Sequence, residues 1–414
     1  MTLMPGRRAA LGLPLALPLM SVAAPAIVRA QSATIRIGVL SDMAGPYAGN
    51  TGPGSLAGTR LAAEDFMKAH PDIRVEVLSA DAQNKVDVGS QIARSWIDTQ
   101  GVDAVLDVPM SALALNLIDI MKEKNKVALF TGPASSDLSG RNCSPNHVHW
   151  VYDSWSLAHA LGTATVQVGG DTWFFLTADY AFGHSLERDT SAFVTAAGGR
   201  IVGSVRHPFP GTADFSSFLV QAQASRAKVL GLANAGADAV NSIKQAAEFG
   251  LTRRGMRIAA MLTQINDVHA LGLESAQGLL VTESFYWDMN DGTRAFAERF
   301  ARERGGQRPG MIHAGGYSAT MHYLKSIASL GAAQGKADGA AVVRRMKEMP
   351  TDDPLFGRGT VRADGRKIHS MHLFQVKAPS ESRGAWDYFK LLQSVPPEQS
   401  FRPMAEGGCP LVRG

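Results

Sequence analysis

The stretch Ile35-Arg36-Ile37-Gly38-Val39-Leu40 decides the fold, because a short apolar run of this kind is typical of a buried strand. A loop with Gly and Pro follows, and then apolar residues at helical spacing from Leu56 to His70. The same order continues, with strands expected at 75–78, 104–108 and 127–130, and helices at 86–99 and 113–124. This regular alternation predicts a parallel sheet with helices on both faces.

The pattern then starts again further along the chain. After a helix at 156–167, strands are expected at 173–176, 201–205, 229–232 and 258–261, and helices at 183–197, 215–224 and 237–249. The sequence therefore predicts an α/β fold of two doubly wound parallel-sheet lobes. Ligands of such sheets bind at the carboxyl ends of the strands. If the lobes face each other, the ligand lies in the cleft between them and hinge closure buries it.

Length and composition agree with two globular domains. The chain has 414 residues, of which 45% are hydrophobic and 19% charged. Three of the four net positive charges belong to Arg7, Arg8 and Arg29, in a segment without acids, so the rest of the chain is near +1. No run of basic residues indicates nucleic-acid binding.

Residues 1–30 are typical of an export signal. Arg7 and Arg8 precede an uncharged stretch from Ala9 to Val28, and Val28-Arg29-Ala30 favours cleavage after Ala30. Prolines in the apolar stretch argue against the alternative, a membrane anchor. The paired arginines fit the twin-arginine route, and Sec export is equally compatible. We therefore expect a periplasmic protein.

Two cysteines, Cys143 and Cys409, remain after export. An even pair in an oxidising compartment favours one disulfide, and two free thiols are the alternative.

Four stretches in this order resemble the type I periplasmic solute-binding proteins of ABC importers, in the group that binds branched-chain amino acids and aromatic acids. They are Ile37 to Tyr47 (IGVLSDMAGPY), Gly132 to Leu138 (GPASSDL), Thr177 to Gly183 (TADYAFG) and Ala276 to Thr282 (AQGLLVT). The resemblance implies a first lobe interrupted by the second and a hinge of three crossing strands, near 150–153, 282–286 and 374–377. The implied boundaries are 31–152 with 283–373 for the first lobe, 153–282 with 374–395 for the second, and a tail at 396–414.

One end of the expected site would bind a carboxylate. Ser111 offers a hydroxyl beside free helix N–H groups, and the turn at Ala134 and Ser135 offers backbone N–H groups with a further hydroxyl. Helix capping is the structural alternative for both serines. The resemblance implies ligand contacts at these positions.

Aromatic residues on loops after strands are candidates to pack on the body of the ligand: Tyr47, Tyr180 and Phe182. Asn234, Ala235 and Thr263 follow later strands and would form the far end, although an ordinary turn is the alternative for Asn234 and Ala235. Amino-acid binders of this family place a tyrosine near Asn234, and its absence leaves room for a bulky group.

The expected ligand is a small carboxylic acid, with an aromatic acid preferred. Amino-acid binders of the family place a glutamate near Thr263 to pair with the ammonium group, whereas no acid occurs between Met256 and Ile265. Burying an ammonium group without a countercharge is costly. A branched-chain amino acid is the alternative ligand.

The sequence does not favour a nucleotide-binding site, a metal site or an enzyme. Gly52-x-Gly54-x-x-x-Gly58 lies too far from its strand for a dinucleotide loop and is interpreted as ordinary loop glycines. His147 and His149 lack an evident third ligand, so we expect neither metal nor cofactor. No arrangement of nucleophile and base indicates an enzyme. The expected partner is a membrane permease of an ABC importer, and a periplasmic sensor for a signalling receptor is the alternative function.

Overall fold

The computed structural model describes residues 33–412, and the chain from Ala33 onward forms one compact unit. The predicted export signal and its cleavage after Ala30 lie outside the described residues. Within the described part of the chain, no helix is both long and apolar enough to cross a membrane.

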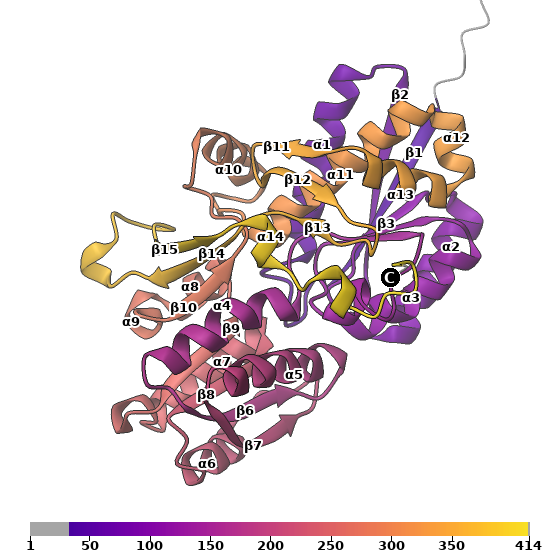
Figure 1. The fold of residues 1–414 in the computed structure, drawn as a ribbon. Coiled ribbons are helices and arrows are strands. Elements are labelled where there is room, and N and C mark those ends of the chain that lie inside the picture. Colours follow the sequence, from indigo (N-terminus) through magenta and orange to yellow (C-terminus); the bar gives the residue numbers. More distant parts are fainter. Residues whose placement is uncertain (1–32, 413–414) are drawn as a thin grey trace, which may run out of the picture. The chain divides into compact units, whose positions relative to one another are not determined.

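The first sheet has five parallel strands in the order β2-β1-β3-β4-β5 (Figure 1). The four residues of β3 are all buried, as expected for a strand covered on both faces. We call this sheet and its helices the first lobe. Its elements are β1 (Ala33–Ser41), β2 (Ile73–Asp81), β3 (Ala104–Asp107), β4 (Val127–Phe130), β5 (His147–His149), α1 (Gly52–Ala69), α2 (Val86–Gln100), α3 (Ser111–Glu123), α11 (Met311–Leu330), α12 (Ala332–Ala337) and α13 (Gly339–Glu348).

The second sheet has four parallel strands in the order β7-β6-β8-β9. We call it, with its helices, the second lobe. Its elements are β6 (Thr172–Ala178), β7 (Arg200–His207), β8 (Val229–Ala235), β9 (Arg257–Leu262), α4 (Ser154–Gln167), α5 (Ala181–Ala196), α6 (Ser216–Ala224), α7 (Gly236–Glu248), α8 (Ile265–Leu271) and α9 (Leu273–Ala276). The expected fold class, two doubly wound lobes of α/β type, is confirmed.

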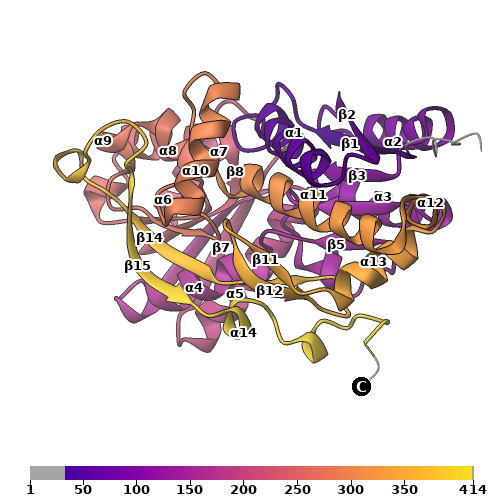
Figure 2. The same cartoon turned by 90° about the horizontal axis from the view of Figure 1, so that it is seen from above.

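Segments far apart in the sequence complete the first lobe. Helix α11 lies beside α1, although more than 200 residues separate them, and both views show the pair side by side (Figures 1 and 2). Two small antiparallel sheets, β10-β14-β15 and β11-β12-β13, follow the second lobe. The remaining elements are β10 (Leu280–Glu283), α10 (Asp291–Glu303), β11 (Thr351–Asp353), β12 (Gly357–Val361), β13 (Lys367–Ile368), β14 (Met371–Val376), β15 (Phe389–Val395), α14 (Pro397–Ser400) and the short 3-10 helices η1 (Ser136–Ser139), η2 (Thr252–Arg254), η3 (Pro379–Glu381) and η4 (Met404–Glu406).

Two local expectations were wrong. The glycines of the Gly52–Gly58 stretch are helical rather than loop residues, because α1 begins at Gly52 with a proline in its first turn. Strand β8 continues through Asn234 and Ala235, which were expected to follow it, since both are buried and Ala235 is paired with Leu262 of β9.

A disulfide joins Cys143 to Cys409, with a Cα–Cα distance of 5.6 Å. It attaches the C-terminal tail to the loop that precedes β5, 266 residues earlier in the sequence.

Candidate functional site

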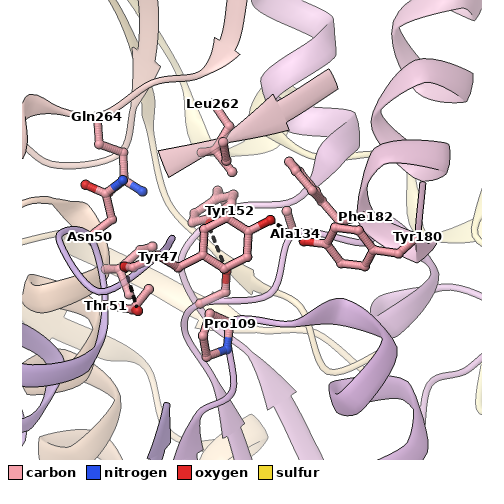
Figure 3. Close-up of a pocket in the computed structure, with 13 residues that line it drawn as sticks. Tyr47, Asn50, Thr51, Pro109, Ala134, Tyr152, Tyr180, Phe182, Leu262 and Gln264 are labelled. Atoms are coloured by element: carbon pink, nitrogen blue, oxygen red, sulfur yellow. Dashed lines mark hydrogen bonds between the residues drawn. The ribbon is translucent and has the colours of Figure 1, made fainter. Parts of the chain in front are cut away.

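One cavity at the carboxyl ends of the strands is lined by both lobes (Figure 3). Five of the nine predicted ligand-binding residues line it, namely Tyr47, Ala134, Tyr180, Phe182 and Ala235. The other lining residues are Asn50, Thr51, Pro109, Gly132, Tyr152, Leu262, Gln264 and Ile312.

The cavity is narrow in this structure. The volume of the cavity is about 20 Å³. That is little more than the ~10–15 Å³ which a single water needs. A ligand of ten or more atoms therefore requires the two lobes, or the aromatic side chains between them, to move apart.

The loop after β1 carries Tyr47 into the cavity, and Asp42 shapes this loop. Its carboxylate accepts hydrogen bonds from the backbone N–H of Gly45 (2.6 Å) and of Tyr47 (2.8 Å), and from the Asn84 side chain (2.6 Å). Asp42 is buried. No local sequence pattern indicates this role of Asp42, because the acceptor and its donors meet only when the loop folds.

The expected carboxylate-binding end consists of groups that already bind one another. The Ser111 hydroxyl accepts hydrogen bonds from the backbone N–H of Ala134 (3.3 Å) and of Ser135 (3.2 Å). The Ser135 hydroxyl lies 2.7 Å from that of Ser185 in the second lobe and also accepts from the backbone of Asp137. Both predicted serines are fully buried and neither lines the cavity, whereas Ala134 does. Ser111 is the first residue of α3 rather than its N-cap.

Three tyrosines give the cavity neutral hydroxyl groups. The Tyr47 and Tyr180 hydroxyls are 2.6 Å apart, and the Tyr152 hydroxyl donates to the carbonyl of Gly132 at 2.6 Å, as the dashed lines in Figure 3 show. Burial raises the pKa of all three hydroxyls. Because the phenols stay protonated, each can donate one hydrogen bond.

Buried acids surround the cavity, and sequence reasoning missed them. Burial raises the pKa of Asp107 and of Asp267 to about 6, that of Asp238 to about 7, and that of Glu283 well above its ordinary value. The lining residues of the cavity include no Lys, Arg or His. An acid inside an apolar strand, as in Val105-Leu106-Asp107-Val108, was the available signal for one of them.

Asp267 also connects the lobes. Its two carboxylate oxygens each accept from the Asn50 side chain at 2.9 Å, and one accepts from the backbone N–H of Gln264 at 2.9 Å. Glu283 is fully buried nearby, and the charge of Asp267 adds to the rise of its pKa. Among the described residues, neither Glu283 side-chain oxygen has a hydrogen-bond partner.

Two predicted residues lie beside the cavity rather than in its lining. The Asn234 amide donates to the Ser242 hydroxyl at 3.1 Å and lies 3.4 Å from Nε2 of His207. Thr263 is buried, while its neighbours Leu262 and Gln264 line the cavity. Side chains alternate along extended chain, so the assignment to Thr263 fell one residue from the cavity-facing positions.

The two strand histidines have structural roles. Nε2 of His147 is 2.8 Å from the carbonyl of Leu138, and Nε2 of His149 is 2.8 Å from that of Pro133. Within residues 33–412, no three His, Cys, Asp or Glu side chains are grouped so that they could hold a metal ion.

Two doubly wound lobes that share one cavity define a two-lobed ligand-binding protein. The chain belongs to the periplasmic binding protein family, whose model matches residues 34–384. This confirms the resemblance to type I periplasmic binding proteins, and the family's role in binding confirms that the protein is not an enzyme.

Solved structures agree with this assignment. A periplasmic binding protein from Burkholderia mallei is 44% identical over 92% of this chain and 100% of its own, with a TM-score of 0.87. A branched chain amino acid ABC transporter periplasmic ligand-binding protein from Burkholderia xenovorans is 38% identical over 91% and 99%, with a TM-score of 0.78. A solute-binding protein from R. palustris in complex with benzoate is 18% identical over 88% and 97%, with a TM-score of 0.75, and shares the fold. A search of the curated proteins found no match.

Proposed function

We propose that this protein captures a small carboxylic acid, preferably an aromatic one, in the periplasm and delivers it to the membrane permease of an ABC importer. A role in transport is supported by the family assignment and by the Burkholderia xenovorans relative, which is an ABC transporter periplasmic ligand-binding protein. One observation carries the ligand class: backbone N–H groups and a hydroxyl meet where Ser111, Ala134 and Ser135 come together, beside aromatic walls.

The site would hold such a ligand by exchanging internal hydrogen bonds for ligand bonds. In the structure, the Ser111 oxygen accepts from the Ala134 and Ser135 N–H groups. A carboxylate oxygen in this position would accept from the same N–H groups, and the Ser111 hydroxyl would turn to donate. Tyr152, Phe182 and Tyr180 would cover the apolar body of the ligand, and burial of that surface favours binding.

A branched-chain or other apolar α-amino acid is the second candidate, and the acids at the opposite end favour it. The expectation of no countercharge rested on the interval from Met256 to Ile265, but Asp267 lies just beyond it and bonds to the lining residue Asn50. A negative charge here would stabilise an ammonium group and disfavour a second carboxylate. The Burkholderia xenovorans relative is described as a branched-chain amino acid protein.

Matched pairs of ligands separate these two candidates. Thermal unfolding of the protein, stripped of ligand by unfolding and refolding, is followed with leucine against 4-methylpentanoate and phenylalanine against 3-phenylpropanoate, together with benzoate and 4-hydroxybenzoate. A ligand at about 100 times its Kd adds about 2.7 kcal/mol to stability, which shifts the melting temperature measurably. Stabilisation by the acids without an amino group supports the organic-acid proposal, and stabilisation by the amino acids alone supports the second candidate. If no compound shifts the melting temperature, the proposed ligand class is wrong.

Replacing Ser111 tests the carboxylate end. Ser111→Ala should raise the Kd of the best acid at least tenfold, since a hydrogen bond to a charged group contributes about 1.5–3 kcal/mol. Ser95→Ala, at an exposed position of α2, is the matched control and should leave the Kd unchanged. Titration calorimetry gives both constants, and equal affinities for the two variants would contradict this role of Ser111.

A further inference from the structure

A short segment of the first lobe lies directly on the second lobe at the rim of the cavity. The carbonyl of Pro46 accepts a hydrogen bond from the backbone N–H of Ala237 at 2.9 Å. The next residue, Tyr47, reaches the Tyr180 hydroxyl at 2.6 Å. Two bonds between the lobes therefore arise from two consecutive residues.

An aromatic ring supports this contact from outside the cavity lining. Phe209, on the loop between β7 and α6, stacks on Tyr47 with ring centres 5.0 Å apart and an interplanar angle of 20°. It also stacks on Tyr180, at 4.6 Å and 19°. Phe209 is half-buried and is not a lining residue, whereas both tyrosines are. Phe209 thus contacts the two rings that join the lobes but does not line the cavity.

The second lobe accepts this segment only because it has a glycine there. Gly236 begins α7 with φ of +58°, and a Cβ at this position would meet the carbonyl oxygen of Pro46 and lie 3.0 Å from the Tyr47 ring. The carbonyl of Pro46 and the ring of Tyr47 therefore occupy the space beside Gly236.

We infer that Pro46, Tyr47, Tyr180, Phe209 and Gly236 form an inter-lobe clasp that stabilises the closed form and slows ligand dissociation. Each contact in the clasp joins two protein groups, so closure has a favourable term that does not depend on the chemistry of the ligand. The inference rests on the proposed function, because it assigns to the same cavity a device that regulates release. Phe209 and Gly236 are positioning residues in this account, since they act through Tyr47.

A pair of glycine substitutions tests the clasp. Gly236→Ala places a methyl group against Pro46 and Tyr47, while Gly272→Ala, in the same lobe, has a φ of +78° and no other atom within 4 Å of its new Cβ. Both variants carry the strain of a side chain at positive φ, but only the first obstructs the clasp. Circular dichroism and the melting temperature establish that both variants fold.

Small-angle X-ray scattering of the exported protein without ligand measures closure directly. We expect Gly236→Ala to have a larger radius of gyration than the unchanged protein, and Gly272→Ala to match the unchanged protein. If Gly236→Ala scatters like Gly272→Ala, the clasp is wrong, whichever ligand the protein binds. This result differs from failure of the proposed function, in which no compound of the panel binds the unchanged protein.

The dissociation rate provides a second test that depends on Phe209. The dissociation rate is measured by stopped flow with the compound that stabilises the protein most. It should be about tenfold faster for Phe209→Ala, because a tenfold change corresponds to a loss of about 1.4 kcal/mol in the free energy that favours the closed form. Phe209→Tyr keeps the planar ring and should restore slow release. Phe218→Ala removes a ring of the following helix α6 that stacks on neither Tyr47 nor Tyr180, and it should leave the rate unchanged. Equal release rates for all three variants would overturn the inference.

Discussion

At the scale of single residues, the cavity depends on an acid that never faces it. Asp107 is fully buried; its carboxylate accepts from the Ser41 hydroxyl at 2.6 Å and from the Thr131 hydroxyl at 3.2 Å. Its backbone has φ of +81°, and that of Val108 has +57°, conformations that cost about 1–3 kcal/mol for residues other than glycine. The carboxylate thus holds together the strained turn that leads to the lining residue Pro109.

This acid should make stability depend on pH. The folded pKa of Asp107 is about 6, above the ordinary 3.8, so the folded state binds its proton more tightly than the unfolded state. The resulting stabilisation is complete below about pH 4 and is lost as the pH rises past about 6, and it amounts to about 3 kcal/mol. Between pH 4 and 7, the free energy of unfolding measured by urea denaturation should therefore fall less for Asp107→Asn than for the unchanged protein. Asp119→Asn, at an exposed position of α3, should show the same decrease as the unchanged protein. Parallel pH profiles for the two variants would show that Asp107 does not titrate in this range.

Sequence reasoning succeeded where local pattern is sufficient and failed where chain segments meet. Short apolar runs such as Trp173–Leu176 predict buried strands on their own, and the residues that follow two of these strands therefore indicated Tyr47, Tyr180 and Phe182. Phe182 lies in the first turn of α5 rather than on the expected loop. Phe209 could not be identified in this way, because its significance comes from stacking on a ring of the other lobe. Asp267 was missed for a related reason, since its partner Asn50 lies 217 residues away in the sequence.

At the scale of elements, the glycines of α1 determine how closely two helices pack. A Cβ at Gly54 would meet the His313 ring, and one at Gly58 would meet the His313 carbonyl oxygen, so both glycines let α11 approach the backbone of α1. Helix α11 carries the lining residue Ile312, and the lining residue Thr51 directly precedes α1. The spacing that resembled a nucleotide-binding loop therefore serves helix packing.

Gly58→Ala tests this packing. The methyl group forces the helices apart, at a cost of about 1–3 kcal/mol, while alanine recovers about 1 kcal/mol through its higher helix propensity. We expect a net loss of up to about 2 kcal/mol in the free energy of unfolding, measured by denaturant titration. Gly49→Ala, whose new Cβ has no other atom within 4 Å, serves as the control. A Gly58→Ala variant more stable than the control would mean that propensity outweighs packing here.

At the scale of the whole molecule, the C-terminal tail supports the binding turn from outside. Arg402 donates a hydrogen bond to the carbonyl of Ser136 at 3.0 Å, next to Ser135. The disulfide between Cys143 and Cys409 fixes the tail in this place and closes a loop of 266 residues. On the chain-entropy model, a loop of that length contributes about 5.6 kcal/mol. The disulfide is therefore expected to affect both stability and binding.

Removing the disulfide should consequently lower the melting temperature strongly and the ligand affinity modestly. In a variant with Cys143→Ala and Cys409→Ala, the unfolded chain regains the freedom of the open loop, and the tail can leave Ser136. Addition of a reductant to the unchanged protein should reproduce the loss, whereas the double variant should not respond to it. Differential scanning calorimetry with and without reductant measures the first effect, and titration calorimetry the second. If the double variant has the same melting temperature as the unchanged protein, noncovalent contacts such as that of Arg402 hold the tail in place without the disulfide. The ligand affinity should then be unchanged as well.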